Sequence, residues 1–216
     1  MEIDFWVRRW KEGRIGFHEG RTNTFLARHE GRLGPAPKHV LVPLCGKTED
    51  MAFLASRGHH VLGIEVVEDA VKAFFDEHEL VPEVRLLRDD DKPVRAYSAG
   101  NVTLLARDLF ACTREIVGPV DALYDRAALV ALSGEVRPRY VAHLRTLLAP
   151  RSRGLVIVFD YDQAQMEPPP YAVSEDELRR LYAGTEVTAI DQGPLDGPRF
   201  RELGVQATER CFMVEL

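Results

Sequence analysis

Residues Val40–Val71, VLVPLCGKTEDMAFLASRGHHVLGIEVVEDAV, follow the pattern strand, loop, helix, strand. The apolar run 39–44 is typical of a buried parallel strand. Thr48 is placed to cap the next helix and Gly58 to end it, and a second strand is expected over 60–66. Such a unit opens many nucleotide-binding folds, but its first loop holds one glycine where a dinucleotide-binding loop has three.

The rest of the sequence alternates between helix and strand patterns without an internal repeat. This alternation predicts an α/β fold with a doubly wound, mostly parallel sheet. Further strands are expected at 102–106, 122–125, 154–161, 186–191 and 210–215, and helices at 3–12, 24–30, 68–78, 137–150 and after the cap residue Ser174. The polar segment 85–101 is expected to hold a short strand or a hairpin, and the segment before the last strand a loop. The breaker GPAPK at 34–38 separates an N-terminal extension, 1–37, from the core, 38–216.

Composition and charge narrow the class of protein. The chain has 216 residues, 45% of them hydrophobic and 29% charged, which suits one globular domain. A net charge of -6 argues against nucleic acid as a partner, because nucleic-acid binding relies on lysine and arginine. The three cysteines have no CxxC or Cys/His spacing, so we expect no metal site and a reducing, cytoplasmic environment. No apolar run approaches the roughly 20 residues that span a bilayer, so we expect no membrane partner.

Glu65 is the first candidate binding residue. It ends the second predicted strand, about 20 residues after Leu44, where an acid accepts hydrogen bonds from ribose hydroxyls. The alternative is a strand-end carboxylate that faces solvent. A loop with a single glycine suits a ligand without phosphates, because phosphates require a closer approach of the backbone. The loop and Glu65 therefore favour S-adenosylmethionine over a nicotinamide dinucleotide.

Two later strand ends carry further candidates. In ARDLF, Asp108 and Leu109 are placed to read an adenine edge and pack on its face, or else Asp108 caps a helix. In YDR, Arg126 is placed to hold the carboxylate of an amino-acid tail or an anionic substrate, unless Asp125 and Arg126 form a local surface pair. Cys45 is interpreted as a packing residue rather than a nucleophile.

Several stretches together resemble the thiopurine S-methyltransferase family. They are FWVRRWKEGRIGFHEG at 5–20, the unit at 40–75, VDALYDRAALVALSGEVRPRYVAHL at 120–144, FDYDQAQMEPPPYAVSEDEL at 159–178 and RFRELGVQATERCFMVEL at 199–216. They cover nearly the whole chain in the family's order. The sequence departs from the family pattern at Arg107, where a glycine is expected, and at Ser133, where a proline is expected.

The resemblance implies a Rossmann-like class I methyltransferase fold that binds S-adenosylmethionine, with residues 1–37 covering the site. By the family pattern Trp10, Leu44, Glu65 and Arg126 contact the cofactor. Asp108 and Leu109 fall in the adenine-contacting loop. Phe17 falls where an aromatic residue faces the substrate, and His18 belongs to the same motif.

The resemblance also implies the reaction: S-methylation of a thiol on a small aromatic or heterocyclic molecule, by a monomer. Arg126 is the expected catalytic residue because its charge favours the thiolate. Trp10 and Phe17 are expected to close over the ligands, whereas helix-face packing is favoured for Trp6. Two alternatives stay open: methyl transfer to selenium or tellurium species or other small thiols, and a nucleotide- or NAD-binding protein without methyl transfer.

Overall fold

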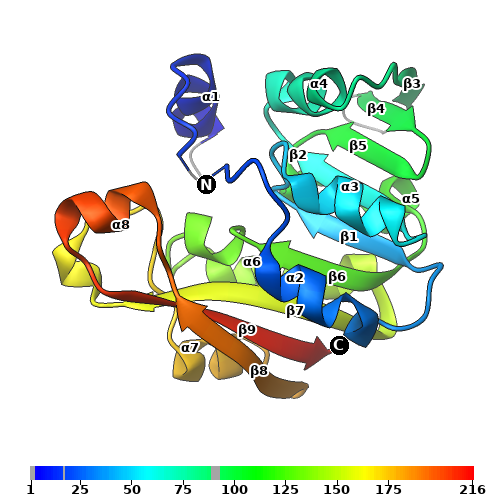
Figure 1. The fold of residues 1–216 in the computed structure, drawn as a ribbon. Helices are drawn as coiled ribbons and strands as arrows, with labels where there is room; N and C mark the ends of the chain where they lie inside the picture. Colours follow the sequence, from blue (N-terminus) through cyan, green and yellow to red (C-terminus); the bar gives the residue numbers. More distant parts are fainter. Residues whose placement is uncertain (1–2, 17, 89–92) are drawn as a thin grey trace.

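The computed structural model describes residues 3–16, 18–88 and 93–216, which form one nine-stranded sheet flanked by helices (Figure 1). The strands are β1 His39–Pro43, β2 His60–Glu65, β3 Glu83–Leu87, β4 Val94–Ala99, β5 Val102–Ala106, β6 Val120–Arg126, β7 Leu148–Tyr161, β8 Glu186–Pro194 and β9 Ala207–Glu215. The α-helices are α1 Ile3–Lys11, α2 Thr24–His29, α3 Glu49–Ser56, α4 Glu68–Glu77, α5 Arg114–Val117, α6 Arg137–Leu147, α7 Glu175–Leu181 and α8 Pro198–Leu203. Short 3₁₀ helices are η1 Glu30–Leu33, η2 Leu109–Ala111, η3 Leu129–Ala131 and η4 Gln163–Gln165.

The centre of the sheet is parallel and its edges are antiparallel. The strand order is β3-β4-β5-β2-β1-β6-β7-β9-β8. β1 pairs in parallel with β2 and β6, β2 with β5, and β6 with β7. The chain runs outward from β1 through β2 to β5 and then returns to β6 on the other side of β1, so the order reverses between β1 and β6. The predicted doubly wound, mostly parallel α/β fold is confirmed.

Alternating side chains along the central strands divide the core into two layers. In β1, Val40 and Val42 pack in the layer that contains α2, α3 and α4, whereas Leu41 packs in the layer that contains α6 and α7. The alternation arises because successive side chains of a strand point to opposite faces of the sheet. Both faces of the parallel centre are therefore covered, and its C-terminal rim is left for a ligand.

The predicted helix starts are confirmed by their caps. The hydroxyl of Thr48 accepts a hydrogen bond from the Asp50 backbone N–H, at 3.4 Å, where α3 begins. Ser174 accepts one from the Glu177 backbone N–H, at 3.2 Å, where α7 begins. The carboxylate of Glu177 binds Arg137 of α6 at 2.6 Å, which ties the two helices together.

One segment has more structure than the sequence pattern predicted, and another has the hairpin that was among its expected structures. The segment before the last strand was expected to be a loop and contains α8, so that expectation is wrong. Pro198 in the first turn and Gly204 in the left-handed conformation after its end (φ 66) are the signals for this helix. The polar segment 85–101 belongs to a hairpin, because β3 and β4 pair antiparallel.

The N-terminal extension has a loosely packed first half and a fixed second half. None of the residues of α1 is buried, and α1 stands apart from the sheet in Figure 1. In α2, by contrast, Phe25 and Leu26 are buried, and the Asn23 side chain caps the helix by accepting from the Phe25 N–H at 2.9 Å. Within the described residues, no helix has the length and apolar character that crossing a bilayer requires.

Gly63 in the middle of β2 permits the close packing beneath the first loop. A Cβ atom at this position would lie 2.3 Å from Cδ2 of Leu104 and 2.7 Å from Sγ of Cys45. Both neighbours are buried, so neither has free space into which to move.

We expect Gly63→Ala to lower the free energy of unfolding by about 1–3 kcal/mol, because the added methyl group overpacks the core. Urea denaturation measures the change. Gly31→Ala is the matched control, because a Cβ there meets no atom within 4 Å. Its effect should stay within about 0.5 kcal/mol. Equal losses in the two variants would show that Gly63 does not act through packing.

Candidate functional site

A cavity of about 820 Å³ lies over the C-terminal ends of β1, β2 and β6. Its floor includes Leu44, Glu65 and Arg126, each at or just after the end of one of these strands. Residues of α1 and the segment 18–21 line one side, and residues 195–200 at the start of α8 line another. The position agrees with the general rule that ligands of such sheets bind where the strand order reverses.

Glu65 joins the loops that follow β1 and β2. Its carboxylate accepts hydrogen bonds from the backbone N–H groups of Gly46, at 2.9 Å, and Val67, at 2.8 Å. Burial raises the pKa of Glu65, and these two N–H donors partly oppose the rise. Only 7% of the residue is exposed, so the alternative of a solvent-facing carboxylate is wrong.

The loop that follows β1 packs closely against Trp10 of α1. Gly46 has φ 52, and a Cβ at this position would lie 3.2 Å from Cζ2 of Trp10. The Trp10 ring therefore lies directly over the loop, although α1 lacks buried residues. Trp6 also lines the cavity, which differs from the helix-face packing favoured for it.

Backbone strain is stored at two adjacent strand ends. Leu44 after β1 has φ 47, and Ala127 after β6 has φ 67, and neither residue is a glycine. Such conformations cost about 1–3 kcal/mol each and concentrate at ligand-binding sites. Both residues line the cavity, and β1 and β6 are neighbours in the sheet.

Arg126 forms the opposite end of the floor from Glu65. Its guanidinium pairs with the carboxylate of Glu19, which comes from the segment between α1 and α2. Its Nε atom is buried and has no hydrogen-bond partner. Burial alone would lower the pKa of Arg126, but the charges of Glu19, Asp50 and Glu209 outweigh it and raise the pKa.

A buried polar network lies beneath this ion pair. Asp50 of α3 accepts hydrogen bonds from the Asn23 backbone N–H at 2.7 Å and the Tyr124 hydroxyl at 2.7 Å. The Asn23 side chain donates to Glu209 of β9 at 3.1 Å. Burial raises the pKa of Glu209, whereas the charge of Arg126 opposes the rise. Sequence reasoning missed Glu19, Asp50 and Glu209, because nothing in the local pattern places them near Arg126.

Asp108 and Leu109 differ in their position relative to the cavity, because only Leu109 lines it. Leu109 lines the cavity together with Arg107. The Asp108 carboxylate accepts from the Phe110 N–H at 3.1 Å and caps η2, and Asp108 is not among the cavity-lining residues. The capping role that the sequence left open for Asp108 is therefore observed, and its contact with an adenine ring stays a prediction.

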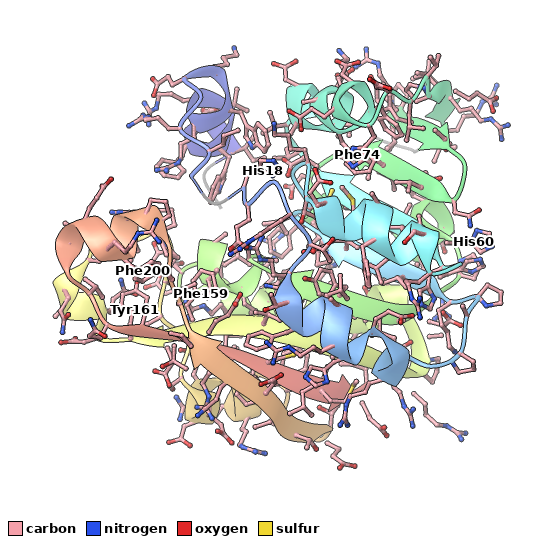
Figure 2. All side chains as sticks on the ribbon, viewed as in Figure 1. His18, His60, Phe74, Phe159, Tyr161 and Phe200 are labelled. Carbon is pink, nitrogen blue, oxygen red and sulfur yellow. The ribbon has the colours of Figure 1, made fainter. Side chains whose placement is uncertain are left out.

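An aromatic wall closes the side of the cavity that faces α8. Phe200 packs edge-on against Phe159, with ring centroids 6.2 Å apart, and against Tyr161, at 5.3 Å. Figure 2 shows these three side chains gathered where β7 ends next to α8. Phe159 and Phe200 line the cavity, and sequence reasoning assigned neither of them to the site. Phe17, which was expected to face the substrate, lies outside the described residues.

Cys45 is a packing residue in this structure. It is buried beside Gly63 and Met51, and burial followed by the charge of Glu65 raises the pKa of its thiol well above the usual range. A nucleophilic cysteine needs the opposite shift.

Among the described residues, one group has the donors and proximity for a metal ion. The ligand atoms of His18, Glu49 and Glu77 lie within 4.8 Å of one another. However, the Lys47 ammonium pairs with Glu77, and His78 contacts Glu49 at 3.1 Å. Because a cationic side chain already balances Glu77, we assign no metal here. His18 lines the cavity. Burial, followed by the charge of Lys47, lowers its pKa.

Asp125 points away from Arg126. It is fully buried in the layer of α6, where the Tyr140 hydroxyl donates to it at 2.8 Å. The alternative of a local Asp125–Arg126 surface pair is therefore wrong, because adjacent strand residues face opposite sides of the sheet. Burial raises the pKa of Asp125 from 3.8 to about 6, despite hydrogen bonds from Tyr140 and the backbone.

This shift predicts a pH-dependent difference between Asp125→Asn and the parent protein. The folded state holds the Asp125 proton more tightly than the unfolded state, so the parent loses stability as pH rises from 3.8 through about 6. The loss is on the order of 3 kcal/mol. Urea denaturation at pH 4 and pH 7 should show the variant gaining about that much relative to the parent. Parallel pH profiles would contradict the assignment.

The structure resembles those of class I methyltransferases. A 1,6-didemethyltoxoflavin N1-methyltransferase of Burkholderia thailandensis, solved with S-adenosylhomocysteine, superposes with a TM-score of 0.67 at 18% identity, over 99% of this chain and 86% of that chain. Magnesium protoporphyrin IX methyltransferase of Synechocystis, solved with S-adenosylmethionine, gives 0.65 at 15% identity, over 100% and 97%. At these identities the likeness defines the fold: a Rossmann-like class I methyltransferase.

Sequence relatives define the family. Residues 1–214 match the family model of thiopurine S-methyltransferase. A thiopurine S-methyltransferase of Pseudomonas aeruginosa strain LESB58 is 45% identical over 100% of this chain and 99% of its own length. One from Azotobacter vinelandii is 47% identical over 86% and 84%. The chain belongs to the thiopurine S-methyltransferase family, and it is a methyltransferase whose cofactor is S-adenosylmethionine.

The residues of the cavity fit this cofactor. The buried carboxylate of Glu65 retains acceptor capacity for sugar hydroxyls beyond its two backbone partners. Arg126 brings a positive charge to the cavity lining, and its buried Nε has no hydrogen-bond partner. Gly46 leaves the space beneath Trp10 that a side chain would fill.

Proposed function

We propose that the protein catalyses S-adenosylmethionine-dependent S-methylation of a thiol on a small aromatic or heterocyclic molecule. The observation that carries the proposal is that a single cavity joins the strand ends with Glu65 and Arg126 to the aromatic wall of Phe159 and Phe200. A cofactor with a sugar and a charged tail suits the first part, and a flat apolar acceptor suits the second.

The strand order supports a definite arrangement of the cofactor. The expected contacts follow β5, β2, β1 and β6 in that order: Leu109, with Asp108 beside it, near the adenine, Glu65 at the ribose, Leu44 in the middle and Arg126 at the tail. Neighbouring strands lie about 4.8 Å apart, so Glu65 and Arg126 are separated by roughly 10 Å across the sheet. This separation suits a ribose at one end and an amino-acid group at the other.

The chain has to align the acceptor more than activate it. When bound, S-adenosylmethionine supplies a methyl group on a positively charged sulfur, which is already activated for transfer. The aromatic wall would hold the acceptor ring flat, and orientation of this kind contributes roughly 7–11 kcal/mol. Arg126 would favour the thiolate form of the acceptor through its charge, which makes it the catalytic residue of this proposal.

In this proposal, the N-terminal extension covers the reacting groups. Trp10 lies over the first loop, Trp6 lines the cavity, and Phe17 is proposed to complete the cover over the acceptor. A cover of this kind excludes water from the transfer step. The absence of paired cysteine motifs supports a cytoplasmic location. The net charge of -6 supports an enzyme that acts on small molecules without nucleic acid or membrane partners. We also propose that the enzyme is a monomer.

We expect Glu65→Ala to weaken S-adenosylhomocysteine binding by roughly tenfold to a hundredfold, since a hydrogen bond to a charged group contributes about 1.5–3 kcal/mol. Isothermal titration calorimetry measures the affinity. Glu83→Ala on the exposed edge strand β3 is the control and should bind like the parent. Parent-like binding by Glu65→Ala would overturn the ribose assignment.

A methyl-transfer assay on a panel of acceptors tests the reaction itself. Aromatic and heterocyclic thiols should be methylated with the highest kcat/KM, because the aromatic wall offers flat apolar contacts. Preference for hydrosulfide or for selenium or tellurium species would favour the alternative acceptor class. Binding of NAD without binding of S-adenosylmethionine would overturn methyl transfer altogether.

A further inference from the structure

The ion pair between Arg126 and Glu19 leaves one hydrogen-bond donor of the guanidinium without a partner. Only 7% of the Arg126 side chain is exposed, yet its Nε donor has no acceptor, and leaving a buried donor unpaired costs free energy. Glu19 is one-third exposed and lines the same cavity. The other carboxylate oxygen of Glu19, Oε2, lies 3.8 Å from Nε of Arg21. The side chain of Arg21 is 75% exposed. Both residues of the pair line the cavity, where Glu19 is partly exposed and the buried guanidinium of Arg126 has one donor without an acceptor.

The charges around Arg126 decide what kind of partner fits. Glu19 pairs with its guanidinium, and Asp50 and Glu209 lie close enough to influence its pKa. Carboxylates therefore outnumber the cation in this corner. Before the cofactor binds, a simple anion gains little at Arg126 because Glu19 neutralises its charge, and a simple cation gains little at Glu19 because Arg126 neutralises it. A group that carries both charges side by side meets a complementary partner for each.

We propose that Glu19 and Arg126 form a paired site for the zwitterionic amino-acid end of the cofactor, in which Arg126 takes the α-carboxylate and Glu19 takes the α-ammonium. This inference rests on the proposed placement of the cofactor tail at Arg126. It adds a binding role for Glu19. Without ligand the two side chains neutralise each other, and the zwitterion replaces that contact with two charge-assisted hydrogen bonds.

The position of Glu19 gives this contact a second consequence. Glu19 lies between α1, which has no buried residues, and Asn23, which is fixed to Asp50 and Glu209. A bond between the cofactor and Glu19 would tie down the chain just after α1.

The test compares three ligands by isothermal titration calorimetry on the full chain. They are S-adenosylhomocysteine, its analogue without the α-ammonium and its analogue without the α-carboxylate. Glu19→Gln should bind S-adenosylhomocysteine and the analogue without carboxylate tenfold or more weakly than the parent. It should bind the analogue without ammonium within twofold of the parent, because that ligand lacks the group that Glu19 holds.

Glu12→Gln is the control, since Glu12 belongs to the same extension but pairs with Arg14 and does not line the cavity. It should match the parent with all three ligands. Equal losses by Glu19→Gln with all three ligands, or tighter binding of S-adenosylhomocysteine, would overturn the paired site. The parent provides a second readout that needs no variant, because removal of the α-ammonium should itself cost tenfold or more. Failure of the parent to bind S-adenosylhomocysteine would instead refute the proposed function.

Discussion

The buried carboxylate of Asp50 holds together the parts of the molecule that build the site. It accepts hydrogen bonds from the Asn23 backbone, the Tyr124 hydroxyl and the Thr48 hydroxyl, so its charge is satisfied although the residue is fully buried. Through these contacts it joins the N-terminal extension, β6 and the start of α3. A buried charge is tolerated only with such partners, and the geometry of the network is therefore tightly specified.

This network fixes one end of the extension, whereas the other end is loosely packed. Asn23 is bound on both sides, by Asp50 and Glu209, whereas α1 has no buried residue and touches the first loop through Trp10. Under the proposed function, such a loosely packed cover would open and close at low cost. The strained backbone of Leu44 and Ala127 lies beneath this cover, where pre-set conformations favour binding.

Local sequence patterns predicted the parts of the fold that short-range physics controls. β1, β2 and α4 were predicted within one or two residues, because apolar runs and caps act over a few neighbours. Glu65 was predicted from its spacing, because a strand–loop–helix–strand unit has a nearly constant length and returns the chain beside its first strand. Asp108 could not be assigned in the same way, because capping and ligand binding both suit an aspartate after a strand. α8 was missed although Pro198 and Gly204 mark its ends, because the surrounding glycines and charges are also typical of loops.

The sequence by itself determined the doubly wound sheet and the two floor residues Glu65 and Arg126, since each depends on local pattern and spacing. It also indicated the family, through the resemblance of several long stretches. Only the tertiary structure decided which groups face Arg126. Glu19 is separated from it by 107 residues, and the Asn23–Glu209 contact spans 186. Contacts over such distances in sequence are set by how the sheet and the extension pack together, and no local preference encodes them. The aromatic wall has the same origin, because Phe159 and Phe200 meet only after α8 folds back against the end of β7.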